Sequence, residues 1–308
     1  MIITLESGED LRGDLIQSAI VRHDLIPIPV TLELNLKDSD KELSQKLECG
    51  KTLTADNIKF NVVKKTLLNS RLTQGDKAVD TLKIIAFIDS VHKVGFVRET
   101  SKSIIKENTT LSQIYRAAGA TASITQGDFP VPSFCCLVGE TPTFHIAKIL
   151  QEESGVIRYK VATQKIEFKR LTDLVNKEKA DATIPENLAR DVDSGFLERH
   201  IVPSFFTIKD DGSIEKNIDN NKSHVMRFAP QKNTLKLKNM RTVLVLKKIA
   251  NVGYIPSISA GDLVDVNEKE KYIVITAAHI YGSSNSEKSE GSAAQMRTKL
   301  WLGKITTK

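Results

Sequence analysis

The chain of 308 residues contains little cysteine, only Cys49, Cys135 and Cys136. Two of the three are adjacent, so they do not form the even, spaced set that a disulfide framework needs, and a reducing compartment is favoured. No apolar run approaches the roughly 20 residues of a membrane span, and the first residues, MIITLESGEDLRG, turn polar too early for a signal peptide. We therefore expect a soluble protein that has no membrane span and is made in a cytoplasm.

Acidic residues are missing from one long window, 220–261, although the net charge of the whole chain is only +6. The window holds the basic residues Lys222, Arg227, Lys232, Lys236, Lys238, Arg241, Lys247 and Lys248. A local basic surface suggests a phosphate-bearing or acidic partner, whereas the plainer alternative is a solvated strand face. Nucleic acid is disfavoured, because only Phe228 and Tyr254 supply aromatic rings there.

Motifs for phosphate binding or catalysis are also lacking. CGKT, at 49–52, is similar to a phosphate-binding loop, but Gln45 stands where that loop requires glycine. SIIK, at 103–106, has the serine–lysine spacing of penicillin-recognising enzymes without their partner triplets. No HExxH, GxSxG or paired CxxC occurs. These absences predict a protein that is not an enzyme.

Two small clusters contain residue types that occur in metal or catalytic sites. Cys135 and Cys136 together with His145 could suggest a metal, but adjacent cysteines do not have zinc-ligand spacing, and buried small residues are the better interpretation. Glu152 and Glu153 are neighbours on an expected helix, so they point apart and cannot flank one bond. We expect no catalytic, cofactor-binding or metal-binding residues.

The pattern of apolar residues predicts mostly strands, with few helices. PVTLELNL, at 29–36, alternates strictly, and LRGDLIQSAIVR, NIKFNVV and TLKIIAFIDSVHKV are also expected to be strands. KDSDKELSQKLE, at 37–48, interrupts them as a polar, possible helix. From Ile201 onward TLKLKNMRTVLVLKK, SAGDLVDV, KYIVITAAHIYG and MRTKLWLGKI predict further strands, with a polar loop, GSSNSEKSEGSAAQ, before the last.

The middle of the chain predicts helices with defined ends. TTLSQIYRAAGA has Thr110 and Gln113 at capping-box spacing and ends at Gly119. A second helix begins at Thr141 and Pro142, presents Phe144, Ala147, Ile149 and Leu150 as its apolar side, and ends at Gly155 as the left-handed terminator. VIRYKV and IEFKRL then form a hairpin, in which Ile157, Tyr159, Ile166 and Phe168 face inward and Arg158 outward.

These phrases, in this order, resemble the hub proteins of phage tails. TLSQIYRAAGA, PVPSF, GETPTFHIAKILQEESGVIRYKVATQKIEFKRL and, near the end, ISAGDLVDVNEKEKYIVITAAHIYG are similar to segments of the family that includes baseplate hubs, late control protein D and the base of the type VI secretion spike. The matching phrases cover about 110 of the 308 residues.

The resemblance implies an α+β, β-rich fold in which two tail-tube-like β-barrel domains are joined by a small α+β element. We expect a first β-barrel at 1–105, a middle region of two helices and a β-hairpin at 106–200, and a second β-barrel at 201–308. The helix–hairpin unit would then be a rigid joint between the barrels.

The resemblance also implies a function and partners. A homotrimer would form a ring that adapts the sixfold tail tube to a threefold central spike, with a tube or tube-initiator protein above and the spike below. Tape measure protein or DNA could occupy its channel during genome ejection, and the protein would belong to the tail or baseplate of a bacteriophage virion. Lys236, Lys238, Arg241, Lys247 and Lys248 are the candidate contacts with an acidic partner. The alternatives are a tail-associated peptidoglycan hydrolase and a hexameric tube-initiator or adaptor protein.

Overall fold

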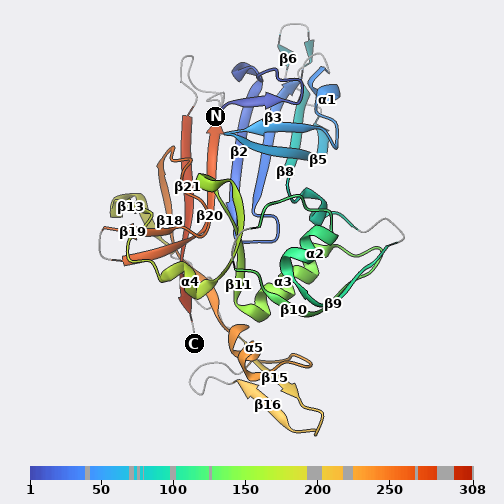
Figure 1. Ribbon diagram of the computed structural model, residues 1–308. Helices are drawn as coiled ribbons and strands as arrows, with labels where there is room; N and C mark the ends of the chain where they lie inside the picture. The colour runs from blue at the N-terminus through green and yellow to red at the C-terminus, as the bar shows by residue number, and fades with distance from the viewer. Residues whose placement is uncertain are drawn as a thin grey trace.

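A long antiparallel sheet runs through most of the protein (Figure 1). The computed structural model describes residues 1–38, 42–68, 73–74, 77–78, 80–97, 102–124, 127–192, 203–217, 225–267, 270–282 and 295–306. The sheet has 12 strands, most of which lie on one path of neighbours. In spatial order the path is β1 (Ile3–Leu5), β4 (Thr52–Ala55), β5 (Ile58–Leu68), β8 (Asp80–Ile88), β3 (Val30–Asp38), β2 (Ile16–Asp24), β20 (Glu270–Gly282), β21 (Gln295–Thr306), β18 (Val243–Gly253) and β14 (Ala189–Asp191).

The remaining strands of this sheet branch from the path. β19 (Leu263–Val266) pairs with β20, and β13 (Ala182–Ile184) pairs in parallel with β19. The two ends of the path, β1 and β14, do not pair with each other among the described residues. The predicted β-rich α+β class is therefore confirmed, whereas closure into barrels is not found in the described strand pairings.

Apolar alternation forms these strands as the sequence predicts. In β3 the side chains of Val30, Leu32, Leu34 and Leu36 are fully buried, and the residues between them are half-buried. A strand turns successive side chains to opposite faces, so this pattern packs one face of the sheet on the core. β5 and β8 pair along most of their length, as neighbours in the same layer.

The two ends of the sequence meet in the middle of this sheet. β2 pairs with β20 in a register that runs from Ser18 opposite Gly282 to Asp24 opposite Thr276. In Figure 1 this appears as blue strands beside red ones. The sheet takes strands from all three of the ranges expected as domains, and the boundaries at residues 105 and 200 stay a prediction.

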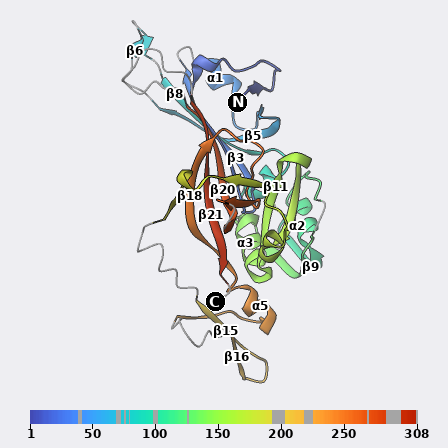
Figure 2. The ribbon, with the colours of Figure 1, turned by 90° about the vertical axis from the view of Figure 1, so that its left-hand side faces the viewer.

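The middle of the chain packs its helices against one side of the sheet (Figure 2). It contains β9 (Ile104–Thr110), α2 (Leu111–Ala117), β10 (Pro130–Cys136), α3 (Pro142–Glu153), β11 (Gly155–Lys160), β12 (Lys165–Arg170) and α4 (Leu171–Val175). β9 pairs with β10, and β11 with β12. Tyr115 of α2 is fully buried, and its hydroxyl donates a 2.7 Å hydrogen bond to the Pro27 carbonyl oxygen. This region thus shares one core with the first strands.

The N-terminus of α2 differs from the predicted capping box. The Asp128 carboxylate accepts a hydrogen bond of 3.0 Å from the Ser112 N–H, while Gln113 accepts one from the Thr109 hydroxyl. An acidic side chain from 16 residues away therefore caps the helix, in place of a local pair. The predicted end is confirmed, since Gly119 follows α2 with a φ of +95°.

A small sheet at the lower end of Figure 1 contains β15 (Ser204–Ile208), β16 (Ile214–Asn217) and β17 (Met226–Phe228). It is followed by α5 (Thr234–Asn239), where the sequence predicted a strand. The Asn233 side chain accepts a 2.9 Å hydrogen bond from the Lys236 N–H, which starts a helix instead. Leu237 is buried against Phe205 and Ala229, whereas Leu235 is exposed. The alternation of leucine and lysine therefore did not mark a strand face, because only one of the two leucines is buried.

The remaining elements are short. They are α1 (Glu42–Lys46), β6 (Thr73–Gln74), β7 (Lys77–Ala78) and the 3-10 turns η1 (Gly13–Leu15), η2 (His92–Gly95), η3 (Val161–Thr163) and η4 (Glu186–Leu188). α1 confirms the helix expected in the polar segment 37–48. The expected loop at 282–295 lies almost wholly outside the described residues. Among those residues, no helix is both long and apolar enough to cross a membrane.

Candidate functional site: the joint around Arg158

The unit formed by α3, β11 and β12 has the helix–strand–strand order that the sequence predicted. Its role as a joint, which the resemblance implies, stays a prediction. Its helix begins as predicted, with Thr141 at the N-cap and Pro142 at the first position. The predicted apolar side was wrong in part, because Phe144 and Ala147 are exposed and the helix buries Ile146 and Leu150.

The left-handed residue that ends α3 is Ser154, with a φ of +50°, so the prediction of Gly155 as terminator was wrong. Gly155 is already the first residue of β11. It is needed for a different reason: a Cβ at this position would lie 2.6 Å from Cε2 of Phe129. The glycine allows the hairpin to approach an aromatic ring of the core.

Arg158, which the sequence placed on the outer face of β11, is instead buried, with 3% of its surface exposed. Its Nη1 donates a 2.8 Å hydrogen bond to the Gly261 carbonyl oxygen and lies 3.4 Å from Asp262 Oδ1. Its Nε lies 3.1 Å from Oε2 of Glu167, its cross-strand partner on β12. One guanidinium therefore connects the hairpin to the loop that leads into β19 of the main sheet.

The carboxylate of Asp262 is held by its own loop as well as by Arg158. It accepts hydrogen bonds of 2.8 Å from the Ser259 N–H and 3.1 Å from the Ser259 hydroxyl. Burial raises the pKa of Asp262 above its ordinary value, although the Ser259 hydrogen bonds and the Arg158 charge oppose this rise. A buried guanidinium facing two carboxylates is a fixed, directional connection, because its planar fork accepts few geometries.

Glu152, near the end of α3, connects the same unit to the region of the small sheet. Its Oε1 lies 2.6 Å from Lys232 Nζ, and its Oε2 lies 3.2 Å from Lys236 Nζ. Its carbonyl oxygen also accepts a 3.1 Å hydrogen bond from the side-chain amide of Asn239. Glu153 faces Arg170, whose Nη2 lies 3.0 Å from Glu153 Oε2. Both glutamates are thus paired with cations of the same chain.

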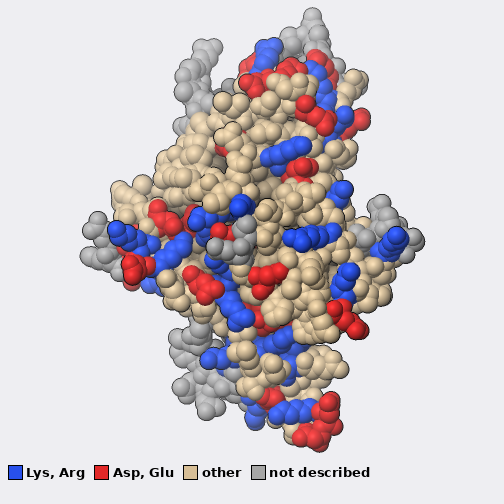
Figure 3. Space-filling view, in the orientation of Figure 1, with Lys and Arg blue, Asp and Glu red and all other residues tan. Residues whose placement is uncertain are grey.

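The predicted partner-interface residues near α5 have different environments. Lys236 forms an intramolecular ion pair with Glu152. Arg241, just after the helix, is buried. Lys238 is exposed. Figure 3 shows Lys and Arg side chains gathered around α5 on this face of the molecule.

The other two predicted interface residues lie on β18. Lys248 forms a 2.7 Å ion pair with Asp191 of the neighbouring β14. Lys247 is exposed and falls at a shift in the register of β18 and β21, between Leu246 and Lys248. Such bulges redirect a side chain away from the ladder. Lys238 and Lys247 are the members of the predicted set that remain turned to solvent.

Exposed apolar side chains are numerous on and around the small sheet. They are Ile208, Ile214, Val225, Met226, Phe228 and Leu235, each at least 44% exposed. The exposure of these side chains was not predicted, because the resemblance assigns the segment to a barrel. A concentration of exposed apolar side chains in one part of a fold is a signal of association.

Two histidines that are far apart in the sequence meet in the core. The rings of His23 on β2 and His279 on β20 pack edge to face with centroids 5.3 Å apart. Both side chains are buried and border a pocket of about 310 Å³ that Asp56 and Ser257 also line. Burial, together with the neighbouring His279, lowers the pKa of His23 to about 3, and burial also lowers that of His279. Both rings are neutral at physiological pH and form part of the strand junction.

Comparison with known proteins gives a match in structure alone. No protein-family model matches the sequence, and no curated protein matches it. The 43 kDa tail protein of prophage MuSo2 from Shewanella oneidensis is similar with a TM-score of 0.64 at 13% identity, over 98% of this chain and 97% of that one. The tail protein of Neisseria meningitidis MC58 follows with a TM-score of 0.62 at 10% identity, over 98% and 96%.

A type VI secretion component from Escherichia coli, described as structurally similar to the bacteriophage T4 tail proteins gp27 and gp5, also matches. Its TM-score is 0.53 at 9% identity, over 97% of this chain and 76% of that one. The chain therefore has the fold of phage tail proteins and of this secretion component, from end to end. The likeness expected from the sequence is confirmed at the level of the fold.

Proposed function

We propose that the protein is a structural hub of a phage tail tip or baseplate, which forms a ring between the tail tube and a central spike. The observation that supports this is the likeness to phage tail proteins over 98% of the chain, with almost no part of either chain left over. The likeness to a secretion component related in structure to gp27 and gp5 favours a place beside a spike. Tape measure protein or DNA would pass through the channel during genome ejection, and the protein would be made in the cytoplasm of the host bacterium.

A homotrimer is the assembly that we propose. The main sheet ends in the short strands β1 and β14, and a closed ring of copies would cover such edges without producing open fibres. The exposed apolar side chains around β15–β17 are a second surface available for contacts with the spike or a neighbouring copy. Arg158 and Glu152 would fix the angle between these two surfaces.

The experiment that tests this proposal is mass measurement of the purified protein followed by cryo-electron microscopy of the assembled particle. We expect three copies per ring, located between the tube and the spike. Six copies per ring would contradict the trimer and favour the hexameric tube-initiator or adaptor. A particle whose ring lacks this protein would contradict the whole proposal.

The alternative of a peptidoglycan hydrolase is tested separately. A glycosidase requires two carboxylates about 5–9.5 Å apart that are available to substrate, whereas Glu152 and Glu153 are engaged by lysines and an arginine. We expect purified protein to leave cell-wall material intact in a zymogram. Clearing that survives in a Glu152→Gln/Glu153→Gln variant would locate a hydrolase site elsewhere.

A further inference from the structure

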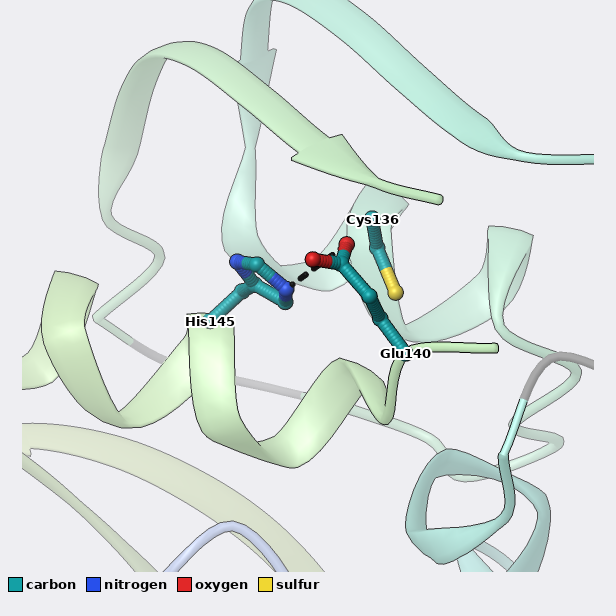
Figure 4. Close-up of side chains that lie close together, drawn as sticks. All are labelled: Cys136, Glu140 and His145. Atoms are coloured by element: carbon teal, nitrogen blue, oxygen red, sulfur yellow. Dashed lines mark ion pairs between the residues drawn. The ribbon is translucent and has the colours of Figure 1, made fainter. Parts of the chain in front are cut away.

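Three side chains with metal-binding atoms converge where β10 leads into α3 (Figure 4). Cys136 is the last residue of β10, Glu140 lies in the following loop, and His145 is in the first turn of α3. The sequence predicts no metal site here, because Cys135 and Cys136 are adjacent. The turn before α3, however, brings Glu140 between Cys136 and His145, which the spacing in the sequence does not show.

We propose that Cys136 Sγ, a carboxylate oxygen of Glu140 and His145 Nε2 bind one zinc ion. The three ligand atoms lie within 4.8 Å of one another, and His145 Nε2 is 3.1 Å from Glu140 Oε2. With zinc–ligand bonds of about 2.0–2.3 Å, neighbouring ligands of a tetrahedral ion are about 3.3–3.6 Å apart. The Glu140–His145 distance is close to this spacing already, and the sulfur, which lies within 4.8 Å of the other two atoms, requires a shift of about 1.2 Å at most.

The histidine nitrogen is presented to this site without a well-aligned hydrogen bond. His145 Nε2 is buried and has no partner of hydrogen-bonding geometry in the part of the chain described, although the Glu140 carboxylate is near. The rings of Phe134 and Phe144 contact the imidazole edge to face and fix its plane. A buried ring nitrogen directed at a carboxylate and a thiol is the arrangement that a bound cation would complete.

The charges of the three ligands suit a divalent ion. A thiolate and a carboxylate carry two negative charges and the imidazole is neutral, so a bound Zn²⁺ gives a site with no net charge, which can be half-buried at low cost. Zinc accepts mixed sulfur, nitrogen and oxygen ligands, whereas calcium and magnesium prefer oxygen alone. The Leu137 N–H donates a 2.7 Å hydrogen bond to Glu140 Oε2, which orients the carboxylate.

An ion can reach the three ligand atoms from solvent. The Glu140 side chain is 42% exposed, so an ion can enter past it. Three protein ligands leave a fourth position for water or for a group from a partner. The competing explanation is a plain ion pair between Glu140 and His145 that locks the turn and binds nothing.

The test uses the full chain, treated with a chelator and kept reduced. Zinc is titrated in competition with a chromophoric chelator, and cobalt(II) is used as a spectroscopic probe of thiolate ligation. We expect one equivalent of zinc to bind, and cobalt to give the near-ultraviolet charge-transfer band of a cobalt–thiolate bond. The variants Cys136→Ser, Glu140→Gln and His145→Gln should each weaken zinc binding at least about tenfold.

The matched control is Cys135→Ser, because Cys135 is the adjacent residue of the same strand and is exposed. It should keep both the affinity and the cobalt band, and Cys136→Ser should lose the band. Absence of stoichiometric binding would overturn the proposal, as would equal loss in the two cysteine variants. If circular dichroism shows that Cys136→Ser is unfolded, the Glu140→Gln variant tests the proposal instead, because it preserves the size of the side chain. Unchanged zinc affinity in Glu140→Gln would also overturn the proposal.

Discussion

Nη1 of Arg158 donates a 2.8 Å hydrogen bond to the carbonyl oxygen of Gly261, a residue 103 positions further along the chain. We expect Arg158→Met to lower the free energy of unfolding by about 3–5 kcal/mol, because it leaves the buried Glu167 and Asp262 carboxylates without their cation. Arg158→Lys should recover only part of the loss, since an ammonium cannot reproduce the planar fork. Denaturant unfolding measures both. Lys165→Met, at an exposed position of the same hairpin, is the control, and an equal effect there would contradict the role of Arg158.

Gly155 should tolerate no side chain, because of the ring beside it. We expect Gly155→Ala to cost about 1–3 kcal/mol of stability through overpacking against Phe129, and Phe129→Leu in the same chain to make the added methyl less costly. Ser154→Gly should stay within about 1 kcal/mol of the parent, since glycine accepts the left-handed conformation freely. A double-mutant cycle in thermal unfolding checks this. Additive effects of Gly155→Ala and Phe129→Leu would show that the ring is not the cause.

Charge reversal should separate the basic residues that stabilise the fold from those that meet a partner. Lys236→Glu places a carboxylate beside Glu152, so we expect a lower melting temperature. Lys238→Glu and Lys247→Glu alter exposed positions and should leave that temperature nearly unchanged. Under the proposed function, these two should weaken binding to the purified spike or tube protein, and the difference from the parent should shrink as salt is raised. Unchanged binding of the Lys238→Glu/Lys247→Glu variant would contradict the predicted interface.

Stability should fall in acid because of His23. Its pKa is lowered to about 3 in the folded protein by burial and by His279, against about 6.5 in the unfolded chain. The unfolded state therefore binds more protons between these values, so the stabilisation is present above pH ~6.5 and is lost as the pH falls toward 3. His23→Leu should give a flatter decline from pH 7 to 5 in denaturant unfolding. At pH 8 the His23 ring is neutral, so the difference in unfolding free energy between His23→Leu and the parent reports packing alone. An unchanged dependence of stability on pH in the variant would show that His23 is not the cause of the decline.

Local pattern predicted the elements of this fold better than their contacts. The alternation in 30–36 was sufficient for β3, because a half-buried strand has that signature whatever its neighbours. The same alternation around Leu235 and Leu237 was misleading, since a short helix with one buried leucine produces it too. The burial of Arg158 could not have been predicted from its charge. Its burial depends on Glu167 across the hairpin and on Asp262, which is distant in sequence and carries no local signal.

The pairing of strands from the two ends of the sequence has a consequence for synthesis. The Thr276 hydroxyl donates a hydrogen bond to Asp24 across 252 positions, at the seam between β2 and β20. At about 5–20 residues per second, a ribosome takes roughly 13–50 s to make that interval. Throughout it β2 has β3 on one side and an open ladder edge on the other, which can pair with any nascent copy nearby. Neighbouring ribosomes on one messenger therefore carry chains with the same open edge, and this is the interval in which pairing between copies competes with folding.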